Sequence, residues 1–295
     1  MPIKNVGCPW ALILPPIVGF AKEYARCNNP RMRYLTPFFL ICLVAAFLAA
    51  QSPSQTLAPT GTLRAIFLGG NPVQGRVDPK TGEATGPVPD LVRELARRLG
   101  VPYKIISAPD AEVILDALKD HTADIGFLAY DPARAREADF GAAFEVMFNS
   151  YLVRSDSPIK KSADVDRTGV KVAAVKGQTQ ELFVSSHLKK AQVRVFQTMP
   201  PQADVERLLG SGEVDVFAIN RQRSLDAQAA SGSKLRALSD SFLEVEQCFV
   251  VEKGARAKLD AIEKFVDELR SSGFIKVSID RAKLTGVDVA SGKKR

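Results

Sequence analysis

Histidine and cysteine are scarce in this sequence, which has two histidines and four cysteines among 295 residues. Three of the cysteines, Cys8, Cys27 and Cys42, lie within the first 50 residues, and Cys248 stands in the apolar context QCFVV. A single cysteine in such a context is most simply a small buried hydrophobe. The sequence has no HExxH or CxxC pattern and no cluster of His and Asp, so it predicts no metal site, no other cofactor and no catalytic residue.

A basic stripe with interleaved aromatic residues is also absent, although the formal net charge is +7. Five basic residues and one acidic residue in the first 50 account for +4 of this charge, which leaves +3 for the rest of the chain. A small and dispersed excess of this kind does not form a phosphate-binding surface. We therefore expect no nucleic-acid partner.

Long apolar runs are missing too, because the longest candidate extends only from Phe38 to Ala50. A membrane-spanning helix needs about 20 apolar residues. A basic start, a short apolar run and small residues at its end are typical of a secretory signal peptide, with Met32 as the expected start. Residues 1–50 are thus predicted to be a leader that sends the protein to the periplasm; an uncleaved anchor is the alternative.

Beyond the leader, residues 51–61 are expected to be a linker, and strand and helix patterns then alternate. Apolar residues recur at helical spacing from Val88 to Leu99, and Gly100 closes that helix. The order strand, helix, strand, helix, strand predicts a parallel sheet with helices on its faces. The expected elements are strands at 63–68, 103–107 and 124–130 and helices at 88–99 and 111–118.

A long strand-like run, Phe144–Val153, follows this unit and leads into a second one. The second unit has expected strands at 170–175, 192–196 and 214–219 and helices at 180–188, 203–209 and 221–229. A further run, Glu244–Val251, then precedes a helix with Leu259 and Phe265 on one face. Two units joined by two such runs predict two lobes with a cleft that can close. The boundaries are 62–152 with 245–285 for lobe 1, 153–244 for lobe 2 and 286–295 for a polar tail.

The stretch ADIGFLAYDPARAREADF, residues 123–140, carries most of the functional information. Asp131 and Pro132 are typical of a helix start directly after a buried strand. Arg134 falls in that first turn, at the strand edge where ligands bind in open α/β sheets. A guanidinium there can clamp a carboxylate with two parallel hydrogen bonds. The alternative is a surface ion pair of Arg134 with Glu137 or Asp139.

Polar residues also follow two strands of the second unit. The turn Lys176–Thr179 contains Gly177, and its backbone amides together with the Thr179 hydroxyl can seat an anion. An ordinary capped helix is the alternative at this turn. Asn220 follows the strand 214–219 and is expected to face the same gap.

These motifs resemble the family 3 extracytoplasmic solute-binding proteins, the receptors of polar amino-acid ABC transporters. The resemblance covers about residues 61–282 and lies in DLVRELARRLG, ADIGFLAYDPARAREADF, YLVRSDSPI, VKVAAVKGQT and GEVDVFAIN. It implies an α/β, two-lobed periplasmic-binding-protein-like fold of type II, with a sheet flanked by helices in each lobe and two hinge crossings. It also implies that Arg134 binds the ligand carboxylate, together with Gln178 and Thr179.

The sequence departs from that family at two positions. Asn220 replaces the aspartate that commonly receives the ligand ammonium, and Val73 replaces an aromatic residue that often stacks on the ligand. Ala129 and Tyr130 are expected at the site, whereas Phe127 is expected in the core. A differently charged carboxylate is therefore an open alternative, with Arg221 or Arg136 as its second partner.

The resemblance thus implies a monomeric receptor, not an enzyme, that captures a small carboxylate or amino acid and delivers it to an ABC transporter permease. The alternative is a dehydratase of cyclohexadienyl acids on the same scaffold. That chemistry needs a general acid, for which Glu145 and Glu181 are the candidates.

Overall fold

The computed structural model describes residues 52–292. The predicted leader and its start at Met32 lie outside these residues, as does the end of the predicted tail. No helix between residues 52 and 292 combines the length and the apolar character that a membrane crossing needs.

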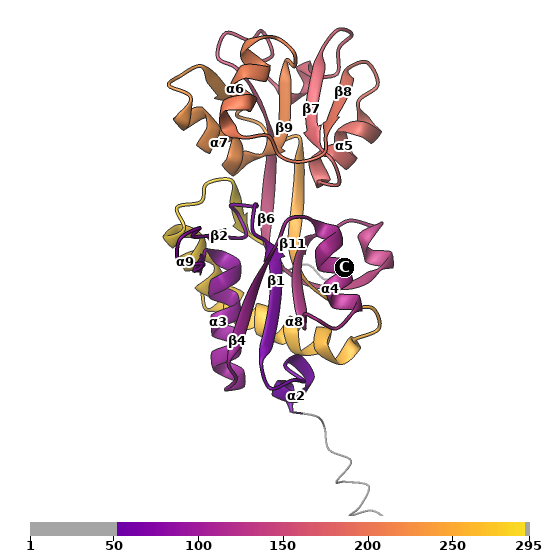
Figure 1. The fold of residues 1–295 in the computed structure, drawn as a ribbon, viewed down its shortest axis with the longest axis vertical. Helices are drawn as coiled ribbons and strands as arrows, with labels where there is room; N and C mark the ends of the chain where they lie inside the picture. Colours follow the sequence, from indigo (N-terminus) through magenta and orange to yellow (C-terminus); the bar gives the residue numbers. More distant parts are fainter. Residues whose placement is uncertain (1–51, 293–295) are drawn as a thin grey trace, which may run out of the picture. The chain divides into compact units, whose positions relative to one another are not determined.

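Lobe 1 is built on three parallel strands, in the order β4 (Tyr103–Ala108), β1 (Leu63–Leu68) and β5 (Ile125–Ala129). Successive residues of β1 point to opposite faces: Ala65 and Phe67 join one core, and Ile66 joins another. Helices cover both faces, with α4 over the Ile66 side and α3 and α8 over the other (Figure 1). These helices are α3 (Pro87–Leu99), α4 (Ala111–Lys119), α8 (Arg256–Ser271) and the shorter α9 (Phe274–Arg281).

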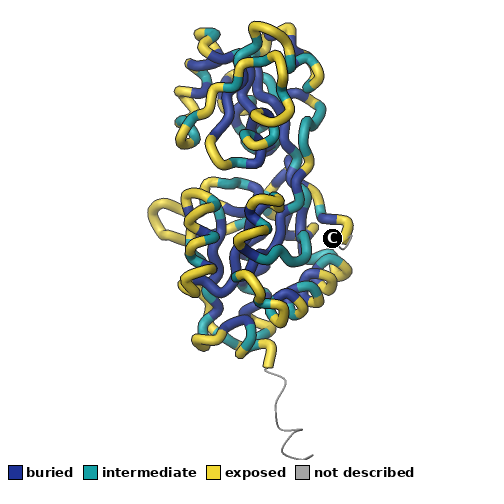
Figure 2. The backbone as a smooth tube through the Cα atoms, turned by 90° about the vertical axis from the view of Figure 1, so that its right-hand side faces the viewer, coloured by how far each residue is buried: buried dark blue, intermediate teal, exposed yellow. Residues whose placement is uncertain are grey.

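Lobe 2 repeats this arrangement with its own strands and cores. Its parallel strands are β8 (Gln192–Phe196), β7 (Lys171–Val175) and β9 (Val216–Asn220). One core lies under α6 (Gln202–Gly210) and α7 (Arg221–Ala230), and the other under α5 (Thr179–His187). Figure 2 shows the buried strands inside each lobe and the exposed loops around them.

Two long strands connect the lobes. β6 (Ala138–Arg154) pairs with β11 (Leu243–Glu252) along its first part and with β9 and β10 (Leu235–Ala237) along its last part. Asn149 marks the change of partner, since it pairs with both Leu243 and Asn220. Each lobe has its sheet flanked by helices, as expected, but the two sheets are not separate: β6 belongs to both lobes and joins their strands into one hydrogen-bonded sheet. No hydrophobic core of the described residues spans both lobes.

Three segments differ from the sequence-based expectation. The helix expected from Pro132 is one 3₁₀ turn, η2 (Arg134–Arg136), because β6 begins at Ala138. Residues 51–61 are not a plain linker, since they contain α2 (Pro53–Leu57), which packs on α8. The start of the predicted polar tail forms β12 (Val287–Val289), which pairs with β6. Short β2 (Arg76–Val77) and β3 (Ala84–Thr85) form a separate hairpin, and η3 (Ser162–Asp164) is a second 3₁₀ turn.

Replacing Leu57 by Ala tests the structural role of α2. Leu57 is 1% exposed and belongs to the main core of lobe 1. A cavity at a buried leucine costs about 2–4 kcal/mol, and we expect this loss in the free energy of unfolding measured with urea. The control Val277→Ala changes an exposed α9 side chain and should shift that free energy by less than about 0.5 kcal/mol. Equal effects of the two changes would contradict the role of α2.

Candidate functional site

Four strands, two from each lobe, end where the lobes meet. β1 and β5 are parallel neighbours in lobe 1, and β9 and β7 are parallel neighbours in lobe 2. Hydrogen bonds cross between the residues that follow these strands. We call this set of residues the lobe interface; it comprises Gly70, Asn71, Ala129, Arg134, Gly177, Asn220 and Arg223.

Arg134 lies at the lobe interface, as the sequence predicts. Its Nη1 donates to the Ala129 carbonyl oxygen at 3.1 Å, and its Nη2 donates across the interface to the Gly177 carbonyl oxygen at 2.7 Å. Only 8% of the residue is exposed, and burial lowers the pKa of its guanidinium. No carboxylate among the described residues forms an ion pair with it, so the predicted alternative of a surface pair with Glu137 or Asp139 is wrong.

Asp131 holds the turn that carries Arg134. Its Oδ1 accepts the backbone N–H of Ala133 at 2.8 Å and that of Arg134 at 3.2 Å. The Asp131 carboxylate thus caps the backbone of η2, as the Asp-Pro pattern indicates. It leaves the guanidinium to reach the other lobe.

The start of α5 faces Arg134 across the interface. Gly177 has φ of +72°, a conformation that glycine adopts without strain, and this turn directs its carbonyl toward Arg134. Thr179, the first residue of α5, is buried, and Gln178 precedes it without a side-chain cap. The predicted anion seat is changed in one respect: the Gly177 N–H donates to Glu181 Oε2 at 3.2 Å. The Gln178 N–H also has a partner, since it donates to the Val175 carbonyl oxygen at 3.2 Å. The Thr179 amide, at the first position of α5, is the donor that this helix start adds.

Asn220 ends β9 at the second crossing. Its Oδ1 accepts the Arg223 backbone N–H at 2.8 Å and so caps α7. Its Nδ2 donates to Asn71 Oδ1 in lobe 1 at 3.3 Å. The residue is 6% exposed, so a neutral amide occupies a buried position between the lobes.

Arg223 is a functional candidate that the sequence analysis missed. Its Nη2 donates to the Gly70 carbonyl oxygen of lobe 1, and no ion pair joins it to a described carboxylate. Arg221 and Arg136, the predicted second partners, have no side-chain hydrogen bond or ion pair with another described residue, and Arg136 is exposed. In the sequence, Arg223 lies three residues after Asn220, which caps α7. It was missed because the candidate residues were those directly after a strand.

The remaining predicted residues divide between site and core. Ala129 contributes its carbonyl to Arg134, whereas Phe127 lies in the lobe 1 core against Phe144 and Phe249. Val73 is also in that core. Tyr130 is 36% exposed and lines a pocket of about 460 Å³ beside the interface. The lining comes from both lobes and β11: Tyr130, Asp131, Thr179, Leu182, Phe183, Ser186, His187 and 243–246.

The two candidate general acids have different surroundings. Glu145 is fully buried on β6, between Gln247 of β11 and Val289 of β12, and its oxygens have no hydrogen-bond partner in the described chain. Burial raises the pKa of its carboxyl well above the ordinary value. Glu181 instead bonds to the Gly177 amide and to Ser185 Oγ. Glu145 therefore has no access to a substrate.

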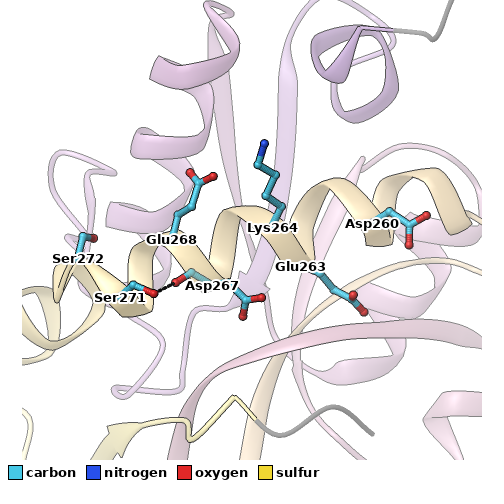
Figure 3. Close-up of a pocket in the computed structure, with 7 residues that line it drawn as sticks. All are labelled: Asp260, Glu263, Lys264, Asp267, Glu268, Ser271 and Ser272. Carbon is cyan, nitrogen blue, oxygen red and sulfur yellow. Dashed lines mark hydrogen bonds between the residues drawn. The ribbon is translucent and has the colours of Figure 1, made fainter.

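A second hollow, of about 670 Å³, lies away from these residues on α8. Figure 3 shows that its lining comes from that helix and the residue after it, with Ser271 Oγ donating to the Asp267 carbonyl at 2.7 Å. A surface on one helix has no opposing wall, so we do not assign a ligand to it. No group of three or more His, Cys, Asp or Glu side chains within residues 52–292 is arranged to hold a metal ion.

Comparison with protein families gives one match that covers most of the chain. The model described as "Bacterial extracellular solute-binding proteins, family 3" matches residues 67–281. No curated protein matches the chain.

Solved structures share the fold at low sequence identity. A putative binding component of an ABC transporter from Wolinella succinogenes, complexed with lysine, has a TM-score of 0.66 and 21% identity, and covers 75% of this chain and 95% of its own. A substrate-binding protein of an amino acid ABC transporter from Streptococcus pneumoniae, bound to L-arginine, has a TM-score of 0.65 and 19% identity. The match covers 79% of this chain and 98% of that protein. The ancestral amino acid-binding protein AncCDT-1, described as a precursor of cyclohexadienyl dehydratase, has a TM-score of 0.63 and 23% identity. The match covers 76% of this chain and 96% of that protein.

The buried carboxyl of Glu145 predicts a pH-dependent stability. Its pKa is raised in the folded protein, so above the ordinary pKa of about 4.3 the unfolded chain loses this proton while the folded chain keeps it. The contribution of Glu145 to stability is therefore complete below that pH and falls as the pH rises. Glu145→Gln cannot ionise, so its free energy of unfolding relative to the unsubstituted protein should increase from pH 4.5 to pH 8. Urea denaturation at several pH values measures this difference, and a difference that stays constant would contradict the assignment.

Proposed function

Because the chain belongs to family 3 of the bacterial extracellular solute-binding proteins, we propose that it captures a small carboxylate between its two lobes. The captured solute passes to the permease of an ABC transporter, and the protein acts in the periplasm as a monomer. Amino acids are the ligands named for the lysine and arginine complexes that share its fold.

The Arg134 guanidinium is the observation that carries this proposal. It is buried at the lobe interface, and it donates to carbonyl oxygens, which compensate a positive charge less well than a carboxylate does. A carboxylate that reaches Arg134 replaces a carbonyl contact by a charge-assisted pair. The Thr179 amide at the start of α5 adds a donor on the opposite side.

Lobe closure follows from where these groups are attached. Arg134 and Asn71 belong to lobe 1, whereas Thr179 and Asn220 belong to lobe 2, so one ligand meets all of them only when the lobes are together. β6 and β11 connect the lobes and can bend where Asn149 changes partners. A ligand that binds the closed form better shifts the population toward it, by as much as its two affinities differ.

For the dehydratase alternative, neither candidate general acid is placed to act on a substrate. Glu145 lies inside lobe 1, and Glu181 is bonded to Gly177 and Ser185. Incubation with prephenate or arogenate, followed by detection of an aromatic product, separates this activity from binding.

Replacing Arg134 by Ala tests the proposal. Removal of one partner from a buried, hydrogen-bonded charge pair costs about 2–5 kcal/mol, which corresponds to a loss of affinity of about 30-fold or more. We expect this loss in calorimetric titrations with carboxylates found by a thermal-shift screen.

Arg136→Ala is the matched control, because Arg136 lies in the same 3₁₀ turn and is exposed. This variant should bind within about twofold of the unsubstituted protein, since a surface charge at this distance contributes little. Circular dichroism shows whether both variants keep the fold. Unchanged affinity in folded Arg134→Ala would refute the proposed role.

A further inference from the structure

A second, partly buried arginine reaches the lobe interface from the opposite lobe. Arg223, on α7, donates from Nη2 to the Gly70 carbonyl oxygen, just as Arg134 donates to that of Gly177. Burial and the nearby charge of Arg76 lower the pKa of the Arg223 guanidinium. Each lobe therefore places one guanidinium against a backbone carbonyl of the other lobe.

The strand registers bring the two crossings close together. In lobe 1, β1 leads to Gly70 and its parallel neighbour β5 leads to Ala129 and Arg134. In lobe 2, β9 leads to Asn220 and Arg223, and its parallel neighbour β7 leads to Gly177. Neighbouring strands are about 5 Å apart, so in each lobe the two crossings start from strands that lie side by side.

The carboxylates near this pair already have partners. Asp131 caps the backbone of η2, and Glu181 accepts the Gly177 N–H. Asp226 pairs with Arg76 at 2.8 Å and accepts from Gln222 at 2.9 Å. Asn71 and Asn220, which bond to each other across the interface, have no charge. The interface thus holds two guanidinium charges without a carboxylate that pairs with either.

From this arrangement we infer that the ligand is a dianion, such as a small dicarboxylate, with one acidic group on Arg134 and the other on Arg223. The inference rests on the proposed function, since it names the ligand class of the same site. Arg134 is buried and Arg223 is partly buried, so both charges are desolvated to different degrees, and two carboxylates pair both guanidinium groups at once. A ligand ammonium would meet the neutral Asn220, so an amino group adds no comparable attraction.

Calorimetric titration of the full-chain protein with succinate, glutarate, glutamine and butyrate tests the charge requirement. We expect the better dicarboxylate to bind at least tenfold more tightly than glutamine and butyrate. Tighter binding of glutamine than of both dicarboxylates would overturn the inference.

Arg223→Gln separates charge recognition from a role in lobe closure. This variant should lose at least tenfold in dicarboxylate affinity and keep its butyrate affinity within about twofold, and Arg223→Lys should recover part of the loss. A purely structural arginine would weaken all ligands alike, and that result contradicts the inference. Arg236→Gln is the matched control, because Arg236 donates only to the carbonyls of Ser157 and Ile159 within lobe 2. It should change no affinity by more than about twofold.

Asn220→Asp provides a second variant that keeps the fold, since aspartate also caps a helix start. The new negative charge should weaken dicarboxylate binding at least tenfold. The affinity for glutamine should rise relative to the affinity for the dicarboxylate. Suppose that Arg134→Ala abolishes glutamine binding, while Arg223→Gln and Asn220→Asp leave the relative affinities for the four compounds unchanged. The inference of a dianionic ligand is then refuted, and the proposed receptor function stands. If none of the four compounds and no carboxylate of the screen binds, the proposed function itself fails.

Discussion

The Arg134 guanidinium bonds to one carbonyl oxygen in each lobe, that of Ala129 in lobe 1 and that of Gly177 in lobe 2. Its burial is costly, because carbonyl dipoles offset only part of a desolvated charge. The carboxylate that we propose as ligand lowers this cost, because it pairs with the same guanidinium that joins the lobes. The other features of the site depend on this position of Arg134, between the end of β5 and the start of α5.

Closure is possible because the lobes share strands but not cores. β6 extends through both lobes, and β11 pairs beside it, while each hydrophobic core of the described chain belongs to a single lobe. In the closure that we propose, bending at Asn149 changes the polar contacts of the interface without opening a packed core. The segment after α9 adds a further connection, since Gln222 Oε1 accepts the N–H groups of Thr285 and Gly286.

Three charged residues with little exposure to solvent differ in their surroundings. Arg134 and Arg223 are positive groups at the interface, where a solute can pair with them, whereas Glu145 is enclosed in lobe 1 and has its pKa raised by burial. A protonated carboxyl can remain inside a sheet, but an arginine keeps its proton and needs a partner. This difference explains why the arginines suit binding and why Glu145 affects stability instead.

The sequence by itself determined the alternation of strands and helices, the two long connecting strands, and the placement of Arg134, Thr179 and Asn220 after strand ends. Periodicity and capping residues are local signals, so they specify which polar groups follow which strand. Only the tertiary structure decided that β6 joins the sheets, that residues after α9 form β12, and that Arg223 meets Gly70. Those contacts bring together residues far apart in the chain, and their pairing depends on strand register and packing, which no local pattern encodes.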